Sequence, residues 1–97
     1  MNEKIIEAIN ERRIIGFYYD GGYRTVEPYV YGVSGTGHEV LRAYQLGGHS
    51  DSGEHEGWKL FKTSRIKNLV ETGEFFTDVR SDFNKEDPAV KEIFAEI

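Results

Sequence analysis

The sequence predicts an α+β fold, in which a small, mostly antiparallel β-barrel of five strands is flanked by an N-terminal and a C-terminal helix. Three observations lead to this prediction. Apolar residues recur with a helical period at both ends of the chain, β-branched and aromatic residues fill the middle, and glycine-rich turns separate the strand-like runs. Because 97 residues can bury only one small core, we expect residues 1–97 to form a single domain.

The first helix is predicted over residues 2–13. Asn2 is a favourable N-cap, and Glu3 suits the positive end of the helix dipole. Ile5, Ile6 and Ile9 lie on one face at helical spacing. The helix therefore has one apolar side with which to cover a sheet.

The barrel is predicted over residues 14–77. Residues 14–19 and 23–33 form a hairpin around an Asp-Gly-Gly turn, and Pro28 places the second strand at an edge or a bulge. In the third strand, residues 38–46, alternation puts Val40, Arg42 and Tyr44 on the face opposite Leu41. Residues 58–64 and 65–73 complete the five strands.

The segment 47–57 contains four glycines and no apolar residue, which predicts a long flexible loop. Its polar residues include potential metal ligands: His49, Asp51, Glu54, His55 and Glu56. They lack the spacing of a helical histidine pair, so no metal site and no cofactor are expected.

The C-terminal helix is predicted over residues 87–97. Asp87 suits the N-cap and Pro88 the first helical position, while Val90, Ile93 and Phe94 begin a stripe that Ile97 completes. This stripe would pack on the barrel or on a neighbouring protein.

Composition excludes several classes of function. The chain has no cysteine, which removes disulfides and thiolate chemistry, and it shows neither a signal peptide nor a membrane span; a cytoplasmic location is expected. Residues 1–70 contain nine acidic and nine basic residues, so residues 71–97 carry the whole net charge of −5. Non-specific binding to duplex DNA needs a surplus of cations, so any anion site must be local.

The stretch GWKLFKTSRI, residues 57–66, is the most basic part of the chain. It spaces Lys59, Lys62 and Arg65 three residues apart among apolar side chains. These cations either meet an anionic ligand or are simply solvated charges that protect a strand edge from aggregation. No nucleophile elbow, phosphate-binding loop or carboxylate pair is present, so we expect binding and no enzymatic activity.

The segments ERRIIGFYY, VEP, RAY and KLFKTSRI occur in an order that resembles the WYL domain family, over roughly residues 3–77. The resemblance implies an SH3-like or Sm-like barrel that senses ligands in bacterial transcription regulators or defence systems. The chain departs from the family in two ways. No helix-turn-helix is predicted, and the tripeptide that names the family reads Glu39-Val40-Leu41.

The resemblance implies a ligand-binding patch at Lys59, Lys62 and Arg65. We add Arg42, because an unpaired charge in the central strand is costly, although a salt bridge to Glu27 or Glu39 would also explain it. Tyr44 shares a face with Arg42 and is the best placed tyrosine for stacking on a base, although core packing is the commoner role.

The predicted function is a sensor domain that binds a nucleotide, a short single-stranded nucleic acid or another small anion. The alternative is a protein-interaction or oligomerisation module, with a protein partner or a homodimer, whose C-terminal helix docks on a neighbour. No membrane partner is expected in either case.

Overall fold

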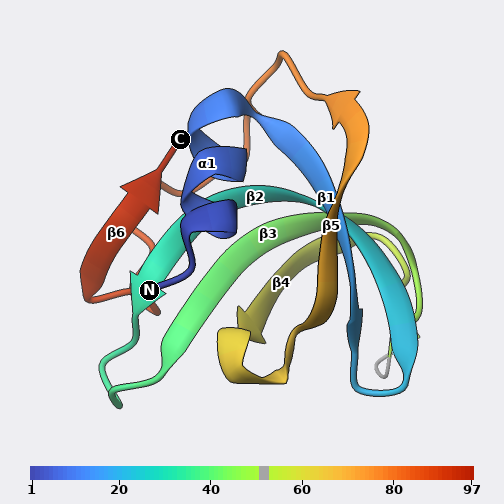
Figure 1. Ribbon diagram of the computed structural model, residues 1–97. Coiled ribbons are helices and arrows are strands. Elements are labelled where there is room, and N and C mark those ends of the chain that lie inside the picture. The colour runs from blue at the N-terminus through green and yellow to red at the C-terminus, as the bar shows by residue number, and fades with distance from the viewer. Residues whose placement is uncertain (51–52) are drawn as a thin grey trace.

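The structure is a computed structural model that describes residues 1–50 and 53–97. Helices and strands follow one another along the chain as α1 (Glu3–Glu11), β1 (Arg13–Tyr19), β2 (Gly22–Val33), β3 (Glu39–Gly48), β4 (Gly57–Lys62), the 3-10 turn η1 (Thr63–Arg65), β5 (Lys67–Phe75) and β6 (Glu92–Glu96). Figure 1 shows α1 lying against one side of a strongly curved sheet. No helix in the described ranges is both long enough and apolar enough to cross a membrane.

The sheet is antiparallel and open. Its strand order is β4-β3-β2-β1-β5, and β6 pairs with the end of β2. The α+β class is therefore as predicted, but the predicted closed barrel of five strands with two helices is wrong: the described residues form six strands and one α-helix. Closure would require β4 and β5 to pair, and they remain the two edges.

The predicted hairpin is confirmed. β1 and β2 pair from Ile15 with Val26 to Tyr19 with Gly22. Asp20 and Gly21 between them both have positive φ, 45° and 90°, the backbone that matches the twist of two strands joined by a two-residue turn. The predicted irregularity at Pro28 is also present, as a register shift between β2 and β3.

α1 and the strands enclose the main core, on what we call the helix face of the sheet. Asn2 caps the helix as predicted, since its Oδ1 accepts hydrogen bonds from the backbone N–H groups of Lys4 and Ile5. The helix ends at Glu11, earlier than predicted, because Arg12 is in the left-handed region with φ 55°. The core on this face contains Ile5, Ala8, Ile9, Ile15, Phe17, Tyr19, Val26, Tyr31, Leu41, Ala43, Phe61 and Ala95.

The predicted C-terminal helix is wrong, because residues 92–96 form strand β6. β1 pairs with β2 only as far as Val26, which leaves Val30–Val33 of the longer strand β2 with unpaired backbone groups on that side. β6 pairs with this free edge and so satisfies those groups. The expected cap Asp87 does accept the N–H of Ala89, but the chain makes only a turn there before it reaches Lys91.

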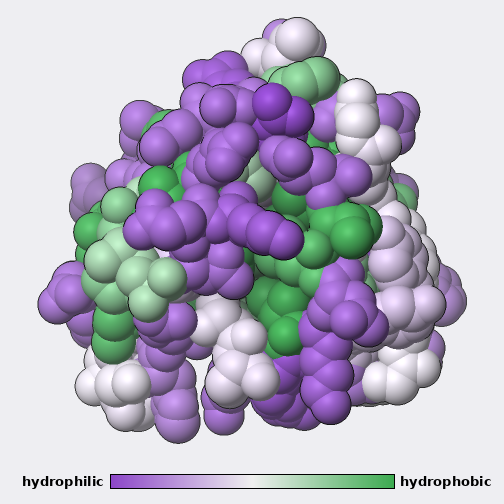
Figure 2. All heavy atoms as spheres, in the orientation of Figure 1, coloured by the Kyte–Doolittle hydropathy of each residue, from purple (hydrophilic) through white to green (hydrophobic). Residues whose placement is uncertain are grey.

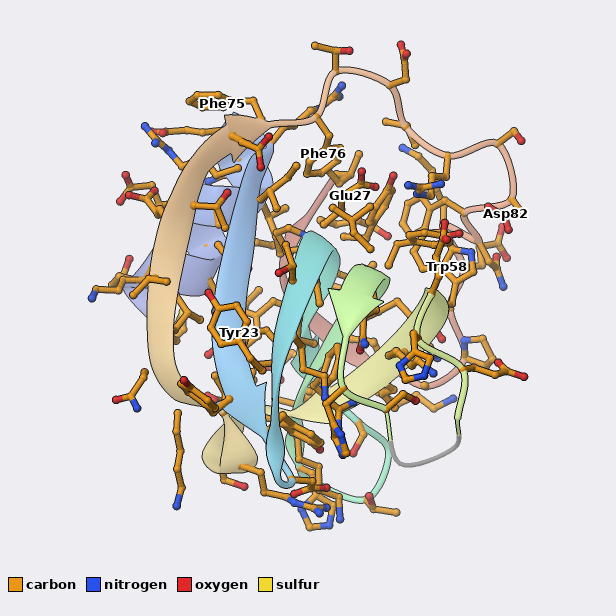
Figure 3. The ribbon with its side chains drawn as sticks, turned by 90° about the vertical axis from the view of Figure 1, so that its right-hand side faces the viewer. Tyr23, Glu27, Trp58, Phe75, Phe76 and Asp82 are labelled. Atoms are coloured by element: carbon orange, nitrogen blue, oxygen red, sulfur yellow. The ribbon has the colours of Figure 1, made fainter. Side chains whose placement is uncertain are left out.

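Residues 76–91, which we call the strap, have no regular secondary structure and cover the other side of the sheet, the strap face. Beneath the strap lies a second core that contains Ile14, Tyr29, Val30, Val40, Phe76 and Val90. Figure 3 shows Phe76 near Glu27 at the point where the strap leaves β5. The central strands are thus covered on both faces, on one by a helix and on the other by an irregular segment, while β5 stays largely exposed.

The open side of the sheet leaves part of the main core near the surface. Figure 2 shows hydrophobic residues in a hollow at the centre of one face, framed by hydrophilic residues. Among the residues that pack on the main core while remaining partly exposed are Ile6, Ile66 and Leu69.

Candidate anion-binding site

The structure does not bring the five sequence-predicted site residues together. Lys62 and Arg65 line one cavity, Arg42 lines another, and Lys59 and Tyr44 line neither of these two. The single patch expected from the sequence is therefore divided: Lys62 and Arg65 lie together, while Arg42, Tyr44 and Lys59 lie elsewhere.

Arg42 is a structural cation. Its Nε and an Nη atom donate to the two carboxylate oxygens of Asp87 in the strap, at 2.6 and 3.2 Å. This two-point pairing ties the central strand β3 to the strap. Neither predicted partner, Glu27 nor Glu39, forms this ion pair.

The pairing lowers the pKa of Asp87. Burial on its own would raise that pKa, but the hydrogen bonds from Arg42 and from the Ala89 N–H outweigh burial and hold it below the usual value. An unfolded aspartate titrates near pH 4, so the stabilisation from Asp87 is fully present above about pH 4. It is lost as the pH falls further, through the lower pKa of the folded state.

We expect Asp87→Asn to lower the free energy of unfolding by about 2 kcal/mol at neutral pH, because the variant loses a charge-assisted pairing. The variant should also lose less stability than the wild type as the pH falls below about 4. Urea unfolding at a series of pH values measures both effects. Asp78→Asn, at an exposed strap carboxylate, is the control, and equal acid sensitivity of both variants would contradict the role of Asp87.

Tyr44 is held by side chains that leave it poorly placed for a base. Its hydroxyl donates to Glu56 Oε2 at 3.0 Å, a bond that raises the Tyr44 pKa. The Arg80 guanidinium lies 3.5 Å from the ring centroid and also pairs with Glu27 at 2.9 Å. Because Arg80 already covers one ring face, Tyr44 serves to hold the strap.

Lys59 projects toward the loop that follows β3. Its Nζ donates to Oγ of Ser50 at 3.3 Å, and Ser50 is buried. Lys59 therefore supports this loop and does not line the cavity that Lys62 lines.

Lys62 and Arg65 do share a cavity of about 450 Å³, which we call the anion cavity. Sequence reasoning missed two further members of its lining, His38 from the turn between β2 and β3 and Lys91 from the end of the strap. The remaining lining residues are Tyr19, Ser34, Gly35, Thr36, Val40, Leu60, Pro88 and Ala89. The lining thus contains three basic residues, a histidine and three hydroxyl groups, but no carboxylate.

A compact turn and the strap position these groups. Ser34 Oγ accepts the N–H of His38 at 3.2 Å and lies 3.1 Å from the Thr36 hydroxyl, which orders the turn. Lys91 donates its backbone N–H to the carbonyl of Val33 at 2.8 Å, and its side chain packs against Gly35. No sequence spacing connects Lys91 with Lys62; the pairing of β6 with β2 brings them to one cavity.

Arg65 separates the anion cavity from a neighbouring hollow of about 520 Å³. Its guanidinium pairs with Asp20, with Nε to Oδ1 at 3.0 Å, and lies 5.2 Å from the centroid of the Tyr19 ring. The neighbouring hollow is lined in addition by Lys67 and the half-exposed Tyr18.

The exposed ring of Tyr18 lines this hollow, and the exposed ring of Tyr23 lies next to it. Their rings meet edge to face, 5.2 Å between centroids. Figure 3 shows Tyr23 lying across β1, where Gly16 leaves room for its ring. Exposed tyrosines next to cations are the residue types that stack on bases in single-stranded nucleic acids.

No group of three potential ligands within residues 1–50 and 53–97 could hold a metal ion. The metal-ligand set considered from the sequence includes Asp51, which lies outside the described residues. The predicted flexible loop 47–57 is also partly outside them, and its ends belong to strands, since β3 extends to Gly48 and β4 begins at Gly57.

Comparison of the chain with protein-family models, with curated proteins and with solved structures found no match.

Proposed function

We propose that this chain is a ligand-binding domain of WYL type that holds a phosphate-bearing anion, either a nucleotide or a short single-stranded nucleic acid, in the anion cavity. It binds its ligand without catalysing a reaction. The setting that the WYL resemblance implies, a cytoplasmic sensor in bacterial transcription regulation or defence, belongs to the same proposal.

The observation that carries the proposal is a cationic cavity without carboxylates in a chain of net charge −5. Among the described residues, no carboxylate pairs with the ammonium group of Lys62 or Lys91. Cations that share one cavity repel one another, and a bound anion removes that cost. A phosphate group could accept hydrogen bonds from Lys62, Lys91 and the hydroxyls of the turn together.

The exposed aromatic rings favour a ligand that also carries bases. Tyr18 lines the neighbouring hollow together with Arg65, which also borders the anion cavity, and Tyr23 contacts the Tyr18 ring. A strand with a phosphate in the cavity could extend a base toward these rings. Duplex DNA hides its base faces, so it gains nothing from them.

The alternative function, a module that docks through a C-terminal helix, loses its main support. The segment that would have docked is strand β6, and Phe94 in it packs against Tyr31 of the same chain, 5.2 Å between ring centroids.

The test is fluorescence anisotropy with a labelled single-stranded oligonucleotide at two salt concentrations. We expect Lys62→Ala and Lys91→Ala each to weaken binding about tenfold, because each removes a charge-assisted contact to phosphate. A duplex of equal length should bind more weakly than the single strand, and both affinities should fall as salt rises.

Lys85→Ala provides the matched control, because Lys85 is an exposed strap lysine that does not line the anion cavity. It should leave the affinity unchanged. If it weakens binding as much as Lys91→Ala does, the attraction is a general charge effect. If the wild type binds neither oligonucleotide nor free nucleotide at low salt, the proposal is wrong.

A further inference from the structure

A second cavity, of about 280 Å³, lies between β4 and the strap and differs in chemistry from the anion cavity. Pro88 and Ala89 line both cavities, so the strap separates them. The volume is near the lower limit for small-molecule sites, which indicates a ligand with few heavy atoms. We call it the aromatic cavity, for the two rings in its lining, Trp58 and Phe83.

The aromatic rings are fixed before any ligand binds. The Trp58 and Phe83 rings are nearly parallel, with 29° between their planes and 5.8 Å between their centroids. Tyr44 and Tyr29 meet the indole edge to face, at 5.3 and 4.8 Å. Trp58 is only partly buried and lines the cavity. A rigid indole surface costs little ordering entropy when a ligand binds.

The cavity also carries negative charge. Asp82 and Asp87 line it together with one cation, Arg42, and the pairing of Arg42 with Asp87 neutralises those two residues. The Asp82 carboxylate accepts the indole N–H of Trp58 at 3.0 Å and forms no ion pair with a described cation. Figure 3 shows the Trp58 and Asp82 side chains side by side, from β4 and from the strap. One net negative charge thus lies at the edge of the indole ring.

We propose that the aromatic cavity binds a methylated ammonium group, carried either by a small molecule or by a methylated lysine side chain. Trp58 attracts the cation through its π-face, and indole is the best of the aromatic side chains for this contact. The Asp82 carboxylate supplies the opposite charge, while Pro88 and Ala89 contact the methyl groups. A strongly hydrated inorganic cation would gain little from such a lining.

Trp58 is the only tryptophan of the chain, so its fluorescence reports on this cavity directly. The experiment titrates the full chain with choline at constant ionic strength, and in parallel with 3,3-dimethylbutan-1-ol, which has the same shape without the charge. We expect a saturable change with choline in the millimolar range or below, and binding of the neutral analogue about tenfold weaker. Sodium chloride should give no saturable change.

Asp82→Asn tests the charge with little change of shape, because the amide oxygen can still accept the indole N–H. We expect it to weaken choline binding about fivefold and to leave the affinity for the neutral analogue unchanged. Lys62→Ala, in the anion cavity, should leave choline binding intact, so this inference does not depend on the proposed function. The indole N–H resonance of the wild-type protein gives a second measurement that needs no variant.

Titration with a trimethyllysine peptide distinguishes the two possible carriers of the methylated ammonium group, a small molecule and a methylated lysine side chain. Binding tighter than that of choline assigns the site to a protein partner, and binding equal to that of choline assigns it to a small molecule. Equal affinity for choline and the neutral analogue would overturn the proposal, because the charge would then contribute nothing. Absence of any saturable change in both fluorescence and the indole resonance would overturn it as well.

Discussion

Phe17→Ala is expected to lower the free energy of unfolding by about 3 to 5 kcal/mol, the usual loss when a fully buried phenylalanine is truncated. Phe17 has no exposed surface, and its ring meets Phe61 edge to face at 5.0 Å and Tyr19 at 6.4 Å. The surrounding strands and α1 cannot collapse fully into the space that remains. Since domains of this size are stable by only about 5 to 15 kcal/mol, the urea midpoint should fall sharply.

Phe75→Ala is the matched control for this variant. The Phe75 side chain is 55% exposed at the end of β5, and Figure 3 shows it at the outer surface. Its truncation should cost less than about 1 kcal/mol. Equal losses for the two variants would show that Phe17 does not lie at the centre of the core.

Gly32→Ala is expected to cost about 3 kcal/mol, because it separates β6 from β2. A Cβ atom at this position would lie 1.9 Å from the carbonyl oxygen of Glu92 and 2.8 Å from a methyl carbon of Val90. The nearest atom belongs to the backbone, so no side-chain rotation relieves the clash, and the strand must move. Urea unfolding measures the loss, and hydrogen exchange should show that the amides of residues 92–96 lose protection.

Gly47→Ala is the control for the glycine substitution itself. Gly47 also lies in a strand, and a Cβ there would meet nothing within 4 Å. Its replacement should change stability by no more than about 1 kcal/mol, in either direction. If Gly32→Ala is as mild as this control and residues 92–96 stay protected, then β6 does not pair with β2 as described.

Local sequence patterns determined the elements whose interactions are close along the chain. The cap of α1 depends on Asn2 and the backbone N–H groups of Lys4 and Ile5. The first hairpin depends on the turn at Asp20 and Gly21. The alternation of β3 predicted that Leu41 and Val40 lie on opposite faces, because successive side chains of a strand point to opposite sides, and the two residues belong to different cores. The cap, the turn and the alternation each involve only residues that are close in the sequence, so the sequence alone was sufficient to predict them.

Tertiary structure alone decided the C-terminal segment and the grouping of the cations. The apolar spacing of Val90, Ile93, Phe94 and Ile97 fits a helix. The unpaired edge of β2, however, offers backbone hydrogen bonds that favour a strand. The sequence near residues 90–97 contains no information about that edge. The same pairing carries Asp87 to Arg42 and Lys91 to the cavity of Lys62. Charged side chains find partners across distances in the sequence. The sequence therefore identified the cations, but only the folded chain separated the one that pairs with Asp87 from those that line a common cavity.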